Sequence, residues 1–256
     1  MRSFDLIGSK EKAVAIVEIK EGDEKALAEE IMKRNKNVKS VLKKVSGRKG
    51  ELRLREYKLI AGDANTEVIH KEYGYLLKLD PQKVYFSPRE ATERQRIAKQ
   101  VKAGERVLVM FSGIGVIPIA IAKKQPEVEK IYGIELNEDA HKYAEENVRI
   151  NKLSHKIFLI HGDVREVAKK YFGKFDRVVM PLPFGAGNFL DIAINCLKKE
   201  GGIIHFYSVE DEGSKVLNEI ESFVKKIGKK IKVLNIKKVS AYAPRKWKVC
   251  IDFQVS

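Results

Sequence analysis

The 256-residue chain carries 50 lysine and arginine residues against 35 acidic residues, a formal net charge of +15. Hydrophobic residues make up 44% of it, enough for one large domain or for a catalytic domain with a small one. The positive excess favours a polyanionic partner such as nucleic acid, although a charge-rich surface is also typical of thermophiles. The longest apolar stretch, 107–122, is too short and too interrupted by glycine to cross a bilayer, so we expect no membrane association.

Cysteine and histidine usage points to a cytoplasmic protein without a metal. Cys196 and Cys250 lie in apolar runs far apart in the sequence, which predicts free core thiols in a reducing compartment. No signal peptide opens the chain. None of the five histidines lies at metal-ligand spacing from another histidine or cysteine. His70 and His205 lie in apolar segments, where a hydrogen-bonded core role is favoured over catalysis.

The first 80 residues predict a small α+β domain, which we expect to position RNA. A helix is predicted over 23–34, where apolar residues line one face. Strands are predicted within 4–19 (two strands and a turn) and over 38–45, 52–60 and 68–79. The Gly-Asp-Ala-Asn turn at 62–65 separates the last two, and the domain ends near Asp80-Pro81.

From residue 81 to 256 strands and helices alternate, which predicts an α/β domain with a parallel sheet covered by helices on both faces. A helix over 89–101 comes first. Strands are predicted over 106–111, 130–136, 157–161, 175–180 and 202–209, and helices near 116–124, 138–151, 164–171, 186–199 and 213–227. The last two strands, 231–241 and 246–254, have no helix between them and predict an antiparallel hairpin at one edge. A Rossmann-like sheet that ends in this way is typical of class I methyltransferases.

Ligand-binding residues follow the first three strands of this sheet. Gly113 and Gly115 let the backbone approach a ligand closely. Glu135 ends the second strand, where a carboxylate can accept hydrogen bonds from both ribose hydroxyls, and Asp163 ends the third, where it can accept from an adenine amino group. Pro118 occupies the place of the third glycine of a dinucleotide fingerprint, which favours S-adenosylmethionine over a dinucleotide. A Rossmann dehydrogenase is the alternative.

Motifs along nearly the whole chain resemble one family, the archaeal and eukaryotic tRNA (guanine(37)-N1)-methyltransferases. They are VYFSPR (84–89), ATER (91–94), IHKEYG (69–74), MFSG (110–113), MPLP (180–183), GIIHFY (202–207) and SAYAPR (240–245). The resemblance extends to the related wybutosine-pathway aminocarboxypropyl transferases. It implies S-adenosylmethionine as cofactor and the tRNA anticodon loop, at position 37, as partner. It also implies the cofactor-binding set Phe111, Ser112, Gly113, Gly115, Glu135, Leu136, Asp163, Val164, Pro181 and Pro183.

The resemblance also implies the catalytic residues. Guanine N1 carries a proton, so a base must remove it while O6 gathers negative charge. Glu93 matches the family's general base, and Arg53 matches the charge stabiliser, with Arg55 in reserve. Tyr85 matches a tyrosine beside the cofactor. Without the resemblance, Glu93 and Arg94 would be interpreted as an exposed helix pair, and Arg53 as an outward strand charge.

Two departures from the family bear on the product. Pro181, which we place beside the reacting atoms, stands where the family has an asparagine, so one hydrogen bond to guanine or cofactor is lost. Val109 stands where the family has an aspartate. An archaeal subgroup shares both departures, and some of its members also methylate carbon 7 of a wyosine precursor at the same tRNA position. The chain also begins after the N-terminal domain with which the family grips the tRNA elbow.

We therefore expect an archaeal, cytoplasmic, monomeric tRNA methyltransferase. One alternative is aminocarboxypropyl transfer, although those relatives have Asn-Arg-Asp where this chain has Gly-Asp-Val at 162–164. The other is a tRNA-binding protein without catalysis.

Overall fold

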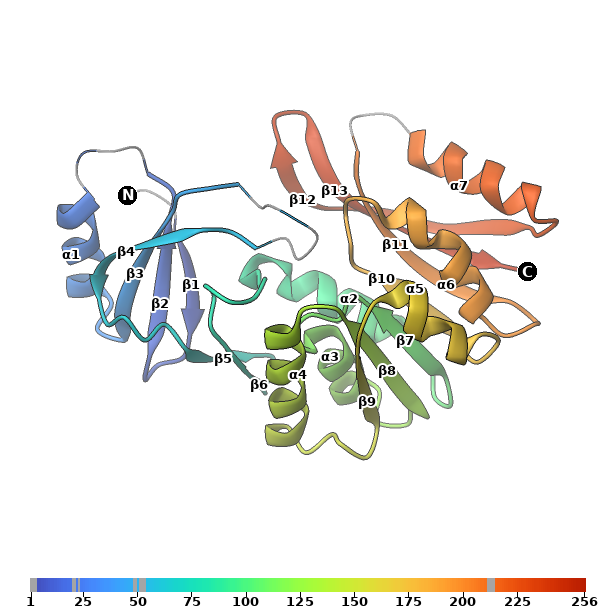
Figure 1. The fold of residues 1–256 in the computed structure, drawn as a ribbon, viewed down its shortest axis with the longest axis horizontal. Coiled ribbons are helices and arrows are strands. Elements are labelled where there is room, and N and C mark those ends of the chain that lie inside the picture. The colour runs from blue at the N-terminus through green and yellow to red at the C-terminus, as the bar shows by residue number, and fades with distance from the viewer. Residues whose placement is uncertain (1–3, 20–21, 23, 48–49, 51–53, 211–214) are drawn as a thin grey trace. The chain divides into compact units, whose positions relative to one another are not determined.

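The structure is a computed structural model that describes residues 4–19, 22, 24–47, 50, 54–210 and 215–256. It divides into two compact units, each made of several segments of the chain (Figure 1). The first unit comprises Met1–Ala91, Gly113–Gly115 and Asn137–Lys152, and the second comprises Thr92–Ser112, Val116–Leu136 and Leu153–Ser256. A domain boundary at residue 80 stays a prediction. No described helix is long and apolar enough to cross a membrane.

A four-stranded sheet with one helix forms the greater part of the first unit. Its strands, in spatial order, are β1 (Asp5–Gly8), β2 (Ala13–Val17), β3 (Val38–Lys44) and β4 (Tyr57–Gly62). Pairs β1–β2 and β3–β4 are antiparallel, while β2–β3 is parallel. Helix α1 (Glu24–Arg34) supplies the crossover between β2 and β3 and buries Ala28 and Ile31 in the apolar cluster that includes β2 and β3. The predicted α+β character of this segment is thus what the structure has.

The predicted strand over 68–79 is wrong, because the segment is a hairpin of β5 (Val68–Glu72) and β6 (Tyr75–Leu79). Tyr73 and Gly74 both have positive φ, 42° and 88°, as a two-residue turn of type I′ requires. Tyrosine at the first of these positions is unusual, so the sequence carried no clear turn signal.

Two asparagines of α4 (Glu138–Ile150) and its C-cap seal the free edge of β6. The Asn147 amide accepts from the Lys78 N–H (2.6 Å) and donates to the Lys78 carbonyl (3.1 Å). Asn151 does the same at Leu76, at 3.1 and 2.6 Å. Each amide therefore pairs with the strand as a neighbouring peptide group would, and satisfies backbone groups that would otherwise be left open.

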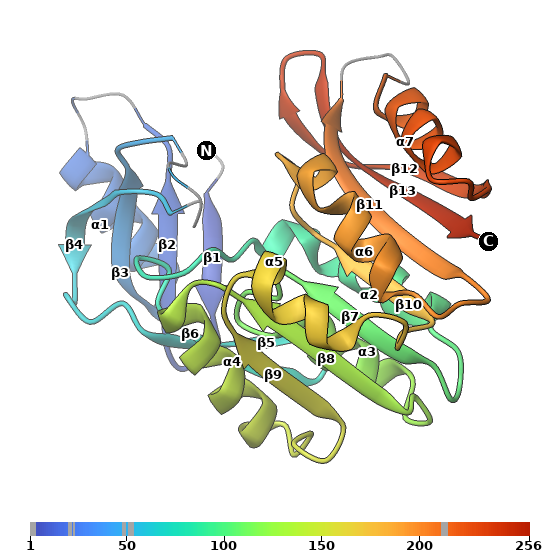
Figure 2. The ribbon, with the colours of Figure 1, turned by 45° about the vertical axis from the view of Figure 1, so that its right-hand side comes forward.

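The second unit is built on a seven-stranded sheet of order β12-β13-β11-β10-β7-β8-β9 (Figures 1 and 2). The strands are β7 (Arg106–Met110), β8 (Lys130–Glu135), β9 (Ile157–His161), β10 (Arg177–Met180), β11 (Gly202–Glu210), β12 (Ile231–Ala243) and β13 (Lys246–Val255). All neighbours are parallel except β13, which runs antiparallel to both β11 and β12. The predicted Rossmann-like sheet with a C-terminal hairpin is confirmed. The strand order reverses at β7 and β10, where sheets of this kind bind ligands.

Helices cover both faces of this sheet. The helices are α2 (Ala91–Gln100), α3 (Val116–Lys124), α5 (Val164–Val167), α6 (Leu190–Cys196) and α7 (Lys215–Lys226), with short 3-10 turns at Ala168–Tyr171 and Ala186–Phe189. A further 3-10 turn, Pro88–Glu90, belongs to the first unit. Helices α5, α6 and α7 lie on one face of the sheet (Figure 2). Buried side chains of these helices belong to an apolar cluster with Met110, Met180 and Phe206. Successive residues of a strand point to opposite faces of the sheet, so Tyr207, next to Phe206, points to the face covered by α2. Cys196 and Cys250 are buried free thiols, as predicted.

Candidate active site

Predicted cofactor residues gather at one edge of the second unit's sheet. They follow the carboxyl ends of four adjacent strands: Phe111 and Ser112 after β7, Glu135 and Leu136 at the end of β8, Asp163 and Val164 after β9, and Pro181 and Pro183 after β10. Gly113 follows Ser112 directly in the chain, and Gly115 comes two residues later. Parallel strands place these positions side by side, and the role of these residues in binding a cofactor stays a prediction.

The turn after β7 has the backbone of a binding loop. Phe111, Gly113 and Gly115 all have positive φ, at 56°, 56° and 78°. Glycine adopts this conformation freely, but phenylalanine is strained in it, and such strain concentrates at ligand sites. The Ser112 N–H donates to the Ile134 carbonyl (2.9 Å), yet its buried Oγ has no hydrogen-bond partner among the described residues. A buried hydroxyl without a partner is costly, and a bound ligand would relieve it.

The ends of β8 and β9 are fastened to each other. The Gly162 N–H donates to the Glu135 carbonyl (2.9 Å), and His161 Nε2 donates to the Leu136 carbonyl (3.0 Å). These bonds fix the backbone that carries the half-buried Glu135 side chain.

Asp163 caps helix α5. Its carboxylate accepts from the Arg165 N–H (2.8 Å) and from the Arg165 guanidinium (2.9 Å). These hydrogen bonds from Arg165 lower the pKa of Asp163, so the carboxylate is charged at neutral pH. The adenine contact of Asp163 stays a prediction, and it would share this carboxylate with Arg165.

Glu93 lies on α2 and is 7% exposed, so the alternative of an exposed pair with Arg94 is wrong. Its partner is Arg96, one turn further along the helix. The Arg96 guanidinium donates to both carboxylate oxygens at 2.8 Å, and the Tyr207 hydroxyl donates to Oε1 at 2.6 Å. Burial and neighbouring negative charge raise the pKa of Tyr207 well above its usual value, so it remains a donor. Among the described contacts, Oε2 accepts only one hydrogen bond and retains a free lone pair.

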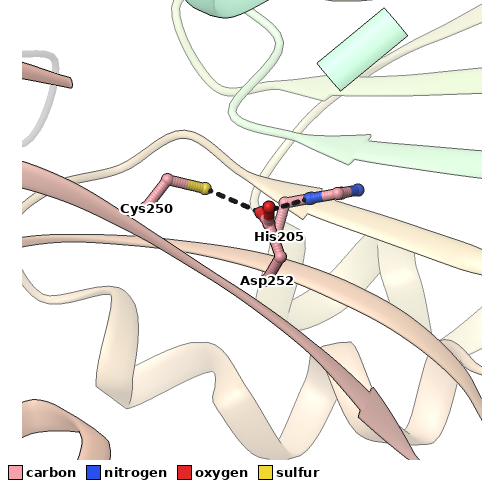
Figure 3. Close-up of side chains that lie close together, drawn as sticks. All are labelled: His205, Cys250 and Asp252. Carbon is pink, nitrogen blue, oxygen red and sulfur yellow. Dashed lines mark hydrogen bonds and ion pairs between the residues drawn. The ribbon is translucent and has the colours of Figure 1, made fainter. Parts of the chain in front are cut away.

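A second buried carboxylate lies behind Arg96. Asp252 of β13 is fully buried, and it accepts from Arg96 and from His205 Nδ1 (2.7 Å). The Cys250 thiol also donates to it (3.2 Å), as Figure 3 shows. His205 Nε2 in turn faces Arg177 Nη1 at 2.7 Å. His205 therefore has the hydrogen-bonded core role that the sequence predicted.

Sequence reasoning missed Arg96, Tyr207 and Asp252. Arg96 could have been found from its i,i+3 spacing to Glu93. Asp252 is the one acidic residue in the apolar run of β13, and the structure places it directly opposite His205 in the β11–β13 pair. That pairing depends on strand register, which the sequence did not provide.

Pro181 and Pro183 lie in the loop after β10, both half-buried. The next residue, Phe184, is 46% exposed, and its ring meets the Tyr242 ring edge-on at 5.1 Å between centroids. Neither proline can donate a backbone hydrogen bond, so the backbone N–H donors of this loop come from its other residues, such as Leu182 and Phe184.

The remaining predicted residues belong to the first unit or lie outside the described residues. Tyr85 donates to Glu90 (3.0 Å). Arg53 lies outside the described residues. Arg55, the alternative candidate for the charge stabiliser, has a buried Nε with no hydrogen-bond partner among the described residues. The catalytic roles of Tyr85 and Arg53 stay predictions.

Comparison with known proteins identifies the family. The model of the TRM5/TYW2 methyltransferase domain matches residues 68–234. The chain belongs to this family. It is 43% identical over 99% of its length to tRNA (guanine(37)-N(1))-methyltransferase Trm5b of Pyrococcus abyssi, of which it covers 75%, and 40% identical over 99% to Trm5b of Methanocaldococcus jannaschii, of which it covers 71%. It is 35% identical over 87% to the tRNA(Phe) (4-demethylwyosine(37)-C(7)) aminocarboxypropyltransferase of Methanocaldococcus jannaschii, of which it covers 88%.

Solved structures of this family share the fold. The crystal structure of Trm5b from Pyrococcus abyssi superposes with a TM-score of 0.87 over 99% of the chain and 75% of that protein. The complex of aTrm5 with tRNALeu, 37% identical, gives 0.86 over 99% of the chain and 72% of that protein.

Proposed function

We propose that this chain is an S-adenosylmethionine-dependent tRNA (guanine(37)-N1)-methyltransferase. Family membership supports the reaction class, and the relatives with the higher identities, 43% and 40%, carry this activity in their names. The observation that carries the proposal is the buried Glu93 carboxylate, held by Arg96 and Tyr207 on a helix of the catalytic sheet. A buried, oriented carboxylate is what proton abstraction from guanine N1 needs.

The residues at the sheet edge fit the cofactor. The strained turn at Phe111 and the buried Ser112 hydroxyl, which has no hydrogen-bond partner among the described residues, support a ligand site at the end of β7. Glu135 would hold the ribose hydroxyls and Asp163 the adenine amino group, since both carboxylates lie at neighbouring strand ends. When bound, S-adenosylmethionine supplies the electrophilic methyl group.

Glu93 would act as the general base. Its Oε2 retains a lone pair for the N1 proton, while Arg96 and Tyr207 fix the plane of the carboxylate. Pro181 and Pro183 would line the guanine without donating to it, and Arg53 would stabilise the charge that develops on O6. We propose position 37 of the anticodon loop as the site of methylation. We also propose a second reaction to be tested, the methylation of carbon 7 of a wyosine precursor.

Aminocarboxypropyl transfer is the second candidate, and the 35% identity with the Methanocaldococcus enzyme is the observation in its favour. The two reactions use different carbons of the same cofactor, so labels in different positions separate them. We expect label from the cofactor methyl group in tRNA and 1-methylguanosine in nucleoside digests analysed by mass spectrometry. A tRNA with adenosine at position 37 is the control. Label that enters tRNA only from the carboxyl carbon would refute the proposal.

Three smaller expectations belong to this proposal: the enzyme is a monomer, works in the cytoplasm and needs no metal. The metal-like group among the described residues, His205, Cys250 and Asp252, supports the last expectation, since its ligand atoms already bind one another and two arginines.

A further inference from the structure

A line of hydrogen-bonded polar side chains, buried or half-buried, runs along the α2 face of the sheet, beyond the residues that the proposed reaction uses. The line starts at the amino ends of β7 and β10, where Glu105 accepts two hydrogen bonds from Arg177 at 2.7 and 2.9 Å. Arg177 continues to His205, and His205 to Asp252. Burying such groups is tolerated only when each is paired, and these four are paired with one another.

The partners of His205 fix its protonation. Arg177 has only N–H donors, so the Nε2 atom that faces it must accept. Nδ1 must then carry the proton and donate to Asp252. Burial lowers the pKa of His205, in agreement with a neutral ring. The neutral imidazole therefore accepts a hydrogen bond from Arg177 and donates one to Asp252, and it adds no charge of its own.

Arg96 joins this line to the active site. One guanidinium donates to the two oxygens of Glu93 and to the two oxygens of Asp252. A planar guanidinium held at both ends has no freedom to rotate away from either carboxylate. Burial opposes ionisation of Asp252, but the hydrogen bonds from His205 and Arg96 outweigh it and hold the pKa of Asp252 well below its usual value.

A metal ion is a poor occupant for the His205, Cys250 and Asp252 group, although their ligand atoms lie within 4.8 Å of one another. Two arginines already bind this group, Arg96 at Asp252 and Arg177 at His205. Burial raises the pKa of the Cys250 thiol well above its usual value, so the thiolate that a metal would bind is disfavoured.

We propose that Asp252 is a positioning residue for methyl transfer, which acts through Arg96 to hold the Glu93 carboxylate in the orientation that accepts the N1 proton. This inference rests on the proposed function. Among the described side chains that donate to Asp252, which are Arg96, Gln100, His205, Asn235 and Cys250, only Arg96 also donates to Glu93, so the effect of Asp252 on the reaction passes through Arg96. Small displacements of a catalytic group are costly: a shift of about 1 Å can reduce a rate by about a hundredfold.

A double-mutant cycle tests the inference that Asp252 positions Glu93. Single-turnover methylation is measured at saturating cofactor and tRNA for the wild type, Glu93→Gln, Asp252→Asn and the double variant. We expect Asp252→Asn to slow the reaction about tenfold or more while cofactor and tRNA affinities stay unchanged. In the Glu93→Gln background, Asp252→Asn should slow the reaction no further, because its effect passes through Glu93.

The outcomes separate the inference from the proposed function. A wild-type rate for Glu93→Gln would remove the general base and, with it, this inference. A slow Glu93→Gln enzyme combined with a wild-type rate for Asp252→Asn, or with losses that multiply in the double variant, would overturn the inference alone. A stoichiometric metal that disappears in Asp252→Asn would also overturn it.

Two further variants keep the test decisive. Asp176→Asn is the matched control, because Asp176 is ion-paired with Lys198 (2.6 Å) just before β10, at the other end of the strand, and we expect a wild-type rate. If Asp252→Asn does not fold, Arg96→Lys replaces it in the cycle, since lysine keeps the positive charge but lacks the planar guanidinium that donates two hydrogen bonds to each carboxylate. The same result is expected, and multiplied losses would again overturn the inference.

Discussion

The Tyr207 hydroxyl donates a 2.6 Å hydrogen bond to Oε1 of Glu93, although the two residues are 114 positions apart in the chain. Tyr207 comes from β11 and Glu93 from α2, so the bond ties the helix that carries the proposed base to the centre of the sheet. Both side chains are buried.

Tyr207→Phe should therefore destabilise the protein. A hydrogen bond to a charged group contributes about 1.5–3 kcal/mol, and its loss leaves a buried carboxylate oxygen less satisfied. Urea unfolding followed by circular dichroism measures the change. Tyr171→Phe is the control, since no described hydrogen bond uses that hydroxyl. Equal stability of Tyr207→Phe and wild type would show that the bond is absent in solution.

Glu135→Ala should weaken cofactor binding. Two charge-assisted hydrogen bonds to the ribose would contribute about 1.5–3 kcal/mol each, so we expect a loss of affinity of about a hundredfold or more. Isothermal titration calorimetry with S-adenosylmethionine measures it, with the exposed Glu127, in the turn before β8, changed to alanine as control. Unchanged affinity in Glu135→Ala would remove this residue from the ribose role.

Stability should fall in acid in two steps. Burial lowers the pKa of His205 below its ordinary 6.5, so below that pH the unfolded chain binds a proton that the folded chain does not. The pKa of Asp252 is likewise held below its ordinary 3.8, and stability that is full above this value is lost as the pH falls further.

Urea unfolding from about pH 7.5 to about pH 3 measures whether the free energy of unfolding falls as the pH falls. We expect this direction because stability rises with pH wherever the unfolded state binds more protons. His205→Gln should flatten the upper step, while the exposed His155→Gln should not change it. A wild-type stability that does not fall below pH 6.5 would contradict the neutral, buried His205.

Binding of tRNA should weaken steeply with salt. Each phosphate neutralised by a lysine or arginine releases counterions, and the logarithm of the binding constant falls by about 0.7–0.9 per contact for each unit of log salt. Filter binding over a salt series measures the slope, and cofactor binding in the same buffers is the control. A flat response would mean that the net charge of +15 is a general surface property and not a docking face.

The sequence predicted best what depends on local pattern. Alternating apolar strands and helices fixed the sheet and its final hairpin, and the strand ends located Glu135 and Asp163 at one edge. The hairpin at 68–79 was missed because Tyr73 adopts a positive φ that tyrosine rarely has. The surroundings of Glu93 were missed for another reason: Tyr207 and Asp252 reach α2 only through strand pairing, which no local pattern encodes.

The amide pairing between α4 and β6 limits how this chain can be divided. Asn147 and Asn151 follow β8 in the chain, yet their backbone partners Leu76 and Lys78 lie within the first 80 residues. A fragment that starts at residue 81 would keep both asparagines and lose the strand they bind. Their amides, and the face of α4 that carries them, would then turn to solvent. Genetic dissection of this enzyme is therefore better done by point substitution than by expressing its parts.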